Sequence, residues 1–198
     1  MIEMGAYSYS MTALNKLNGR LGDIIIGKFC SIAHEVGFYF GETHSQYNIA
    51  LHPFSNLTDV TVANTDREQK PYVREGKYLD SKYDSPLEHE AEPIVIRNDV
   101  WIAQGARLLE GATIDNGAIV GAFSVVAGYV EPYALVVGNP AKMVRKRFDE
   151  DEIQKLLEIR WWDWPVEIIK EVIPTLRTPM VTNLVAFYNK YQHEIRTN

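Results

Sequence analysis

The chain has 198 residues, of which 46% are hydrophobic and 23% charged, a composition typical of one soluble domain with an apolar core. Its formal net charge of −6 offers no basic footprint for nucleic acid or for an anionic lipid surface, so neither is expected as a partner. The sequence has no run of 18 apolar residues and no signal-peptide pattern, so we expect a cytoplasmic protein without membrane insertion.

An apolar repeat with a period of six begins in the N-terminal part of the chain. Ile26, Ile32 and Phe38 stand six residues apart, and Cys30 and Val36 follow the first two at a spacing of four. The single cysteine therefore lies at an interior position and has no partner for an internal disulfide. We expect it to pack as a small apolar residue rather than to act as a nucleophile.

This repeat stops in the stretch "GETHSQYNIALHPF", residues 41–54, which carries His44 and His52. An inserted segment follows, residues 41–93, that is polar, charged and punctuated by proline, and its tyrosines favour a partly ordered lid or arm. A histidine titrates near neutral pH and can serve as a general base, whereas an isolated histidine is more often a surface residue. Both interpretations of His44 remain open on these residues alone.

The period of six resumes at Ile96 and holds over six units. The aliphatic series is Ile96, Ile102, Leu108, Ile114, Val120 and Val126, and the small or β-branched residues four positions later are Val100, Ala106, Ala112, Ala118, Ser124 and Val130. This period fits neither the spacing of a helix nor the alternation of a strand. It is typical of a parallel β-helix, in which each hexapeptide is one strand with its turn and three hexapeptides make one coil. The prediction is a mainly β domain over residues 1–147, interrupted by the insertion.

Residues 148–198 have a helical pattern instead. Asp149 and Glu152 form a plausible capping box, Pro165 opens a second helix that Pro174 closes, and a third begins near Val181. We expect these helices to cover the open end of the β-helix, with the tryptophans of "RWWDWP" packed as an anchor.

Metal binding is an alternative from a different class of protein. Some hexapeptide-repeat proteins hold zinc through three histidines near a subunit interface and hydrate carbon dioxide. The five histidines of this chain contain no short pair on one element; they are His34, His44, His52, His89 and His193. We therefore expect no metal site.

A short basic run stands out in this acidic chain: Lys142, Arg145, Lys146 and Arg147. Clustered cations of this kind suit phosphate groups. The alternative is a solvated face, or ion pairing with the acidic "DEDE" that follows, and for Arg147 the two interpretations are equally favoured.

Seven motifs occur in one order along residues 4–175: "MGAYSY", "IGKFCSIA", the G-x-x-H of residues 41–44 followed by "HPF", "IRNDVWIAQGA", "DNGAIVGAFSVV", "VVGNPAKMVRKRF" and "RWWDWP". Together they resemble the hexapeptide-repeat xenobiotic acetyltransferases, which include streptogramin A acetyltransferases and hexapeptide-type chloramphenicol acetyltransferases. The resemblance implies a homotrimer of left-handed parallel β-helices, with acetyl-CoA bound in the groove between two subunits.

The resemblance also implies roles for individual residues. His44 matches the histidine that removes the proton of the acceptor hydroxyl as that hydroxyl attacks the thioester, without a covalent acyl-enzyme. Trp101 matches an aromatic residue beside this histidine, and His52 and Tyr7 are further candidates on the acceptor side. The candidates for binding CoA are Ala103, Gln104, Gly121, Ala122, Asn139, Pro140, Lys142, Arg145 and Arg147.

Three departures from the family pattern concern the acceptor. Thr43 and Ser45 stand where drug-modifying members usually carry Asn and Arg, His52 replaces a more usual aromatic residue, and the insertion is longer. These differences favour a saccharide hydroxyl over an antibiotic. Two alternatives remain: N-acetylation of an amino sugar with the same base and cofactor, and a non-catalytic protein that binds a partner through its arm.

Overall fold

The computed structural model describes residues 1–12, 22–40, 49 and 91–196. The strands are β1 (Ile2–Met4), β2 (Tyr9–Ser10), β3 (Ile24–Ile26), β4 (Ser31–Ile32), β5 (Gly37–Tyr39), β6 (Ile94–Ile96), β7 (Trp101–Ile102), β8 (Arg107–Leu109), β9 (Thr113–Ile114), β10 (Ile119–Val120), β11 (Val125–Val126), β12 (Tyr129–Val130), β13 (Ala134–Gly138) and β14 (Ala141–Lys146). The helices are α1 (Glu150–Ile159), the short 3-10 helix η3 (Trp161–Asp163), α2 (Val166–Leu176) and α3 (Val181–Arg196).

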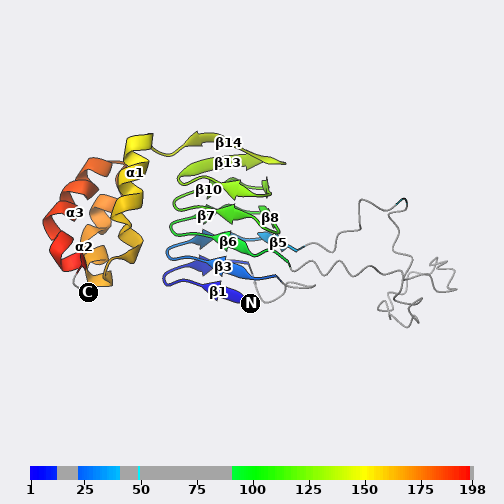
Figure 1. Ribbon diagram of the computed structural model, residues 1–198, viewed down its shortest axis with the longest axis horizontal. Helices are drawn as coiled ribbons and strands as arrows, with labels where there is room; N and C mark the ends of the chain where they lie inside the picture. The colour runs from blue at the N-terminus through cyan, green and yellow to red at the C-terminus, as the bar shows by residue number, and fades with distance from the viewer. Residues whose placement is uncertain (13–21, 41–48, 50–90, 197–198) are drawn as a thin grey trace. The chain divides into compact units, whose positions relative to one another are not determined.

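The strands form three sheets that the chain visits in turn, so that successive coils stack on one another (Figure 1). The sheet orders are β1-β3-β6-β9-β12, β14-β13-β10-β7-β4-β2 and β11-β8-β5. The pairs within these sheets are parallel, apart from the antiparallel hairpin of β13 and β14. Ile102 pairs with Val120 and Leu108 with Val126, three hexapeptides further on, as the predicted coil requires.

The core of the coils is the aliphatic series that the period of six predicts. Its residues are almost completely buried: Ile26, Ile32, Phe38, Ile96, Ile102, Leu108, Ile114, Val120 and Val126. Cys30 is also fully buried, and its Sγ lies 2.9 Å from the carbonyl oxygen of Arg97, to which the thiol donates a hydrogen bond. The interior role expected for this cysteine is confirmed.

The last coil departs from the expected register. Val130 pairs with Ile114 and Val136 pairs with Val120, so this coil is shorter than three hexapeptides. The prediction that Val130 is the small residue of a sixth unit is therefore wrong, because Val130 takes the aliphatic position of the next strand. The turn before it is shortened around Gly128, whose φ of 83° a glycine adopts without steric cost.

Two stacks of turns with positive φ flank the six-stranded sheet. We call the stack before its strands the first corner, made by Tyr7, Phe29, Asp99, Gly117 and Tyr133, with φ between 56° and 70°. The stack after its strands is the second corner, made by Glu35, Gly105 and Phe123, with φ between 57° and 69°. The coil makes its sharp bend at these positions through the left-handed conformation.

The helical segment begins as predicted. Asp149 caps α1, its side chain accepts a hydrogen bond from the backbone N–H of Glu152, and the reciprocal bond completes the capping box. Pro174 does not close the second helix, because α2 continues to Leu176. A proline this close to the C-terminal end removes one backbone hydrogen bond and leaves the remaining turn intact.

The helices pack on the first corner and not on the open end of the coils, which corrects the expectation. Trp161 lies 4.9 Å from Phe29 between ring centroids, Lys28 Nζ lies 3.0 Å from Asp163 Oδ1, and Tyr133 joins the apolar cluster of the helices. The physical reason is that the first corner carries bulky aromatic residues whose apolar surface the helices bury. Trp162 and Trp164 are buried, as expected of packing residues.

Two further expectations concern residues that lie, in whole or in part, outside the described ranges. Nearly all of the inserted segment, residues 41–93, lies outside them, so the predicted arm and the domain boundaries stay predictions. Across the helices that the structure does describe, none combines the length and apolarity of a membrane span.

Candidate functional site

The two histidines at the break in the repeat, His44 and His52, lie outside the described residues, together with Thr43 and Ser45. The assignment of a general base therefore stays a prediction. What the structure describes is the surface around Trp101 and the residues predicted to bind the cofactor.

Trp101 lies on the outer face of the six-stranded sheet. The register aligns one residue from each strand in a row: Tyr9, Ser31, Trp101, Ile119, Leu135 and Arg145. Side chains alternate between the two faces of a strand, and the next residues along, such as Ile102 and Val120, are buried, so this row faces outward. The indole of Trp101 is 52% exposed and is available to a ligand or to a second copy of the chain.

Tyr7 does not lie in this row. It belongs to the first corner, where its ring stacks on Phe29 with 4.9 Å between centroids. The neighbouring tyrosine, Tyr9, occupies the row instead, separated from Trp101 by Ser31. The sequence "YSYS" offers two candidates at this point, and only the pairing of β2 with β4 distinguishes them.

The second corner brings together most of the residues predicted to bind the cofactor. Ala103 and Gly121 follow β7 and β10 on adjacent coils, where Ala103 N–H donates to Val120 O at 2.9 Å and Gly121 N–H donates to Val136 O at 2.8 Å. Gln104 comes next and donates from Nε2 to Glu35 Oε2 at 3.2 Å.

Packing within the protein by itself requires that Gly121 carry no side chain. A Cβ at this position would lie 2.7 Å from Cγ1 of Val137 on β13, which is too close for any real contact. Close packing of the β13 hairpin therefore excludes a side chain here, independently of the cofactor. The small size of Gly121 alone is not a signature of the cofactor site.

The β13–β14 hairpin extends the second corner by one coil. Gly138 N–H donates to Ser124 Oγ at 3.0 Å and fixes the base of the hairpin, and the exposed Asn139 and Pro140 form its turn. Ala122 is exposed on the coil below. The structure thus places Ala103, Gln104, Gly121, Ala122, Asn139 and Pro140 along one edge of the stack.

Two cations of the basic run point outward from β14. Lys142 pairs in register with Val137 and Arg145 with Leu135, and both side chains are exposed. Neither forms an ion pair with a carboxylate within the part of the chain that the structure describes, and Arg145 donates a hydrogen bond from Nη1 to Lys146 O. Both are therefore available to a phosphate group.

Arg147 faces the other way, toward the first corner. Its Nη1 donates to Gly117 O at 2.6 Å and lies 3.4 Å from Asp99 Oδ2, and its guanidinium lies 5.3 Å from the centroid of Tyr133. Burial raises the pKa of Asp99, and the Arg147 charge partly opposes that rise. Arg147 is thus a structural residue of the first corner.

Lys146 is also engaged within the protein. Its Nζ lies 3.1 Å from Glu131 Oε2 and 2.8 Å from Glu150 Oε2. The pairing with the acidic stretch that the sequence offered as an alternative for the basic run therefore holds for Lys146. Lys142 and Arg145 remain as candidates for the phosphates.

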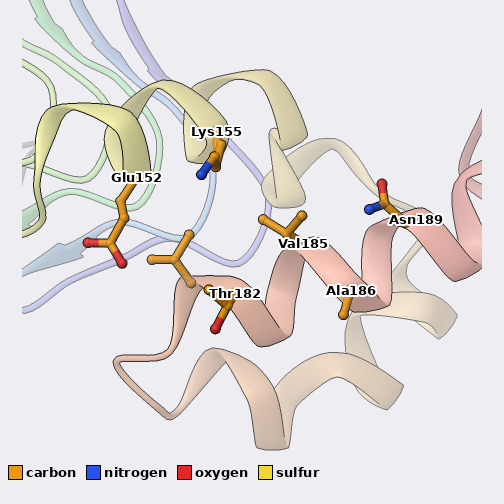
Figure 2. Close-up of a pocket in the computed structure, with 7 residues that line it drawn as sticks. Glu152, Lys155, Thr182, Val185, Ala186 and Asn189 are labelled. Carbon is orange, nitrogen blue, oxygen red and sulfur yellow. The ribbon is translucent and has the colours of Figure 1, made fainter.

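A cavity of about 280 Å³ lies elsewhere, between α1 and α3 (Figure 2). Glu152 and Lys155 of α1 face it from one side, and α3 supplies the others: Val181, Thr182, Val185, Ala186 and Asn189. None of the predicted site residues lines this cavity, so it is not the candidate site. Within residues 1–12, 22–40, 49 and 91–196, no three side chains of His, Cys, Asp or Glu gather as metal ligands.

Known proteins resemble the chain along most of its length. Residues 93–128 match the model of the bacterial transferase hexapeptide family, with six repeats. A chloramphenicol acetyltransferase of Agrobacterium fabrum (strain C58 / ATCC 33970) is 35% identical over 83% of this chain and 71% of its own. A probable macrolide acetyltransferase of Lysinibacillus sphaericus is 37% identical over 86% of both chains.

Among solved structures, the polysialic acid O-acetyltransferase OatWY is 20% identical, with a TM-score of 0.44 over 73% of this chain. The chain spans about half of that protein, 53% of its length. The two sequence relatives carry the assignment, because each is more than 30% identical and is covered over more than two thirds of its length. The chain belongs to the hexapeptide-repeat family of xenobiotic acetyltransferases.

Proposed function

We propose that the protein transfers the acetyl group of acetyl-CoA to a hydroxyl of a small molecule or saccharide. The observation that carries this proposal is the 37% identity to an acetyltransferase over 86% of both chains. The proposal includes a homotrimer of left-handed β-helices, with each active site between two subunits. The exposed Trp101 on an outward row of the sheet supports it, because a second subunit would enclose that face.

The small residues of the second corner and the cations near it suit the chemical groups of acetyl-CoA. Ala103 and Ala122 carry only methyl side chains at this edge, so an extended pantetheine arm can approach the backbone there. Lys142 and Arg145 project from the adjacent β14 and suit the phosphates at the nucleotide end. Arg147 is left out of this proposal because its partners lie within the protein.

His44 is the proposed general base. Acetyl-CoA supplies an activated acetyl group as a thioester. His44 takes the proton from the acceptor hydroxyl while the oxygen forms its bond to the acetyl carbon, and the carbon–sulfur bond then breaks. The proton passes from His44 to the leaving sulfur, so that the products are an acetyl ester and CoA with a free thiol. Trp101 is the aromatic residue that we propose beside this base.

The acceptor class is an open choice between two groups of compounds. The relatives named above are chloramphenicol and macrolide acetyltransferases, whereas Thr43, Ser45 and the long insertion favour a saccharide hydroxyl. Compounds of both groups therefore belong in one panel of acceptors to be assayed. An acetyl ester is labile to mild base and an acetamide is not, so treatment of the product also distinguishes O-acetylation from N-acetylation of an amino sugar.

The test is the rate of CoA thiol release with this panel, for the wild type and for His44→Ala. We expect His44→Ala to lower turnover by about 10²- to 10⁴-fold, the range for loss of a general base, while calorimetric affinity for acetyl-CoA and the oligomer mass stay unchanged. His193→Ala is the matched control, because His193 is an exposed histidine of α3, away from the second corner.

Unchanged turnover of His44→Ala would contradict the assignment of the base. A wild-type protein that neither binds acetyl-CoA in calorimetry nor releases thiol with any acceptor would contradict the enzymatic function. That result would favour the non-catalytic interaction protein.

A further inference from the structure

Phe123 has an unusual combination of conformation and exposure. It lies at the second corner with a φ of 57°, in the left-handed region that bulky side chains rarely adopt, and its side chain is 68% exposed. A glycine would adopt this turn without strain, as Gly105 does one coil below. The phenylalanine therefore brings a conformational cost without the burial that would offset it.

The other left-handed aromatic residues are accounted for by contacts within the protein. Phe29 packs between Tyr7 and Trp161, each with 4.9 Å between ring centroids. Tyr133 is 1% exposed and lies against Phe148 and Arg147. For Phe123, no ring partner is found among the described residues.

The ring of Phe123 nevertheless has a fixed support. It lies over Gly105, where an added Cβ would be 2.4 Å from Cε1 and 2.5 Å from Cδ1 of the ring. The backbone of Phe123 is held there by a hydrogen bond from its N–H to Gln104 O at 2.9 Å. The corner thus supports the ring from one side and leaves its other surface open.

The surroundings of this ring combine apolar surface with positive charge. Ala122 precedes it, and the next coil presents Val137, which is 41% exposed. Val137 lies against Gly121, and its partner in the hairpin register is the exposed Lys142. An exposed flat ring with a cation on the neighbouring hairpin suits a purine that carries phosphate groups.

We propose that Phe123 is the platform on which the adenine ring of CoA stacks, with Lys142 at the neighbouring phosphates. This inference rests on the proposed function, because it takes CoA as the ligand. It adds a binding residue outside the small residues and cations already considered. It also explains why a strained turn holds an exposed phenylalanine.

The experiment compares Phe123→Gly with the wild type by calorimetric titration of CoA and of adenosine 3′,5′-bisphosphate. Loss of one stacked base should weaken both ligands by about 5- to 150-fold. Phe123→Tyr should restore the affinity, because it keeps an aromatic face. The melting temperature of Phe123→Gly should not fall, because glycine relieves the left-handed strain. Tyr129→Ala is the matched control, since Tyr129 is 61% exposed on the sheet of β1, β3, β6, β9 and β12.

Each contrary outcome has a distinct meaning. A wild type that does not bind CoA contradicts the proposed function itself. A wild type that binds CoA, with equal affinity in Phe123→Gly, contradicts only the stacking. Weaker binding of CoA with unchanged binding of the bisphosphate would assign Phe123 to the pantetheine arm and overturn the proposal. Dissociation of the oligomer in Phe123→Gly would overturn it as well, because the ring would then belong to a subunit interface.

Discussion

The two corners of the six-stranded sheet contain the same local arrangement with opposite outcomes. At the first corner Tyr133 lies over Gly117, and at the second Phe123 lies over Gly105; in each case an added Cβ would be 2.4 Å from the ring. Tyr133 is 1% exposed, whereas Phe123 is 68% exposed. The difference is that the helical segment and Arg147 pack on the first corner. One repeating turn thus serves packing at one edge and leaves an aromatic ring exposed at the other.

The same contrast divides the basic run between two roles. Arg147 bonds to Gly117 and Asp99 of the first corner, whereas Lys142 projects from the hairpin next to the second. Four cations that look alike in the sequence therefore separate by the edge on which their strand places them. Charge clustering in a sequence indicates a phosphate site only after the cations with internal partners are removed.

The largest effect expected from this comparison concerns the two aromatic residues. Tyr133→Ala should lower the free energy of unfolding by about 3–5 kcal/mol, as other large buried side chains do, because it opens a cavity under the helices. Phe123→Ala should change it by about 0.5 kcal/mol or less, since the exposed ring loses little burial. Urea titration monitored by circular dichroism measures both.

Tyr133→Phe is the control for this pair. The buried hydroxyl of Tyr133 has no hydrogen-bond partner among the described residues, so its removal should be neutral or slightly stabilising. Similar losses in Tyr133→Ala and Phe123→Ala would show that something covers both corners equally, and the contrast would then fail.

The sequence predicted the interior of the coils because each hexapeptide repeats the same requirement. The aliphatic residues at steps of six from Ile96 to Val126 all face inward, and Cys30 is buried as expected. The shift at Val130 could not be predicted, because a valine fits both the small and the aliphatic position. The location of the helices and the partner of Arg147 depend on contacts between distant residues, for which a periodic pattern contains no information.

Prediction of the candidate site was similarly uneven. The small residues Ala103 and Gly121 come together at one corner, whereas Tyr7 lies at the other corner and Tyr9 takes its place in the row of Trp101. Phe123 was missed because its position belongs to a turn, where side chains are usually unimportant. The available signal was a bulky residue at a turn position that holds glycine in the three preceding hexapeptides, Gly105, Gly111 and Gly117.

A smaller effect is expected from the two glycines under the rings. Alanine at either position must adopt a left-handed φ, at about 1–2 kcal/mol. In Gly117→Ala the Cβ also meets the buried ring of Tyr133, and overpacking adds about 1–3 kcal/mol. In Gly105→Ala the exposed ring of Phe123 can move aside, so only the first cost applies. The difference between the two melting curves tests this, and equal losses would show that Phe123 is held as firmly as Tyr133.

The smallest expected effect is a dependence of the free energy of unfolding on pH, caused by Asp99 at the first corner. Burial raises the pKa of Asp99, against the opposing charge of Arg147, so the folded protein holds this proton more tightly than the unfolded chain. The stability that the protonated group contributes is complete below the unfolded pKa and is lost as the pH rises through the folded pKa. The free energy of unfolding of the wild type, relative to Asp99→Asn, should therefore fall with increasing pH and then level off. One proton limits the slope to about 1.4 kcal/mol per pH unit.

At the same corner, Asp163 should change the stability with pH in the opposite direction. Burial opposes ionisation there too, but hydrogen bonds from Arg160 and Lys28 outweigh it and lower the pKa of Asp163. The stability of the wild type relative to Asp163→Asn should therefore be lost as the pH falls through the folded pKa, and should be complete above the unfolded pKa. Urea midpoints at a series of pH values measure both differences. If the free energy of unfolding of the wild type relative to Asp99→Asn instead rose with pH, the ion pair with Arg147 would outweigh burial. The first corner would then be held by charge pairing more than by the covering helices.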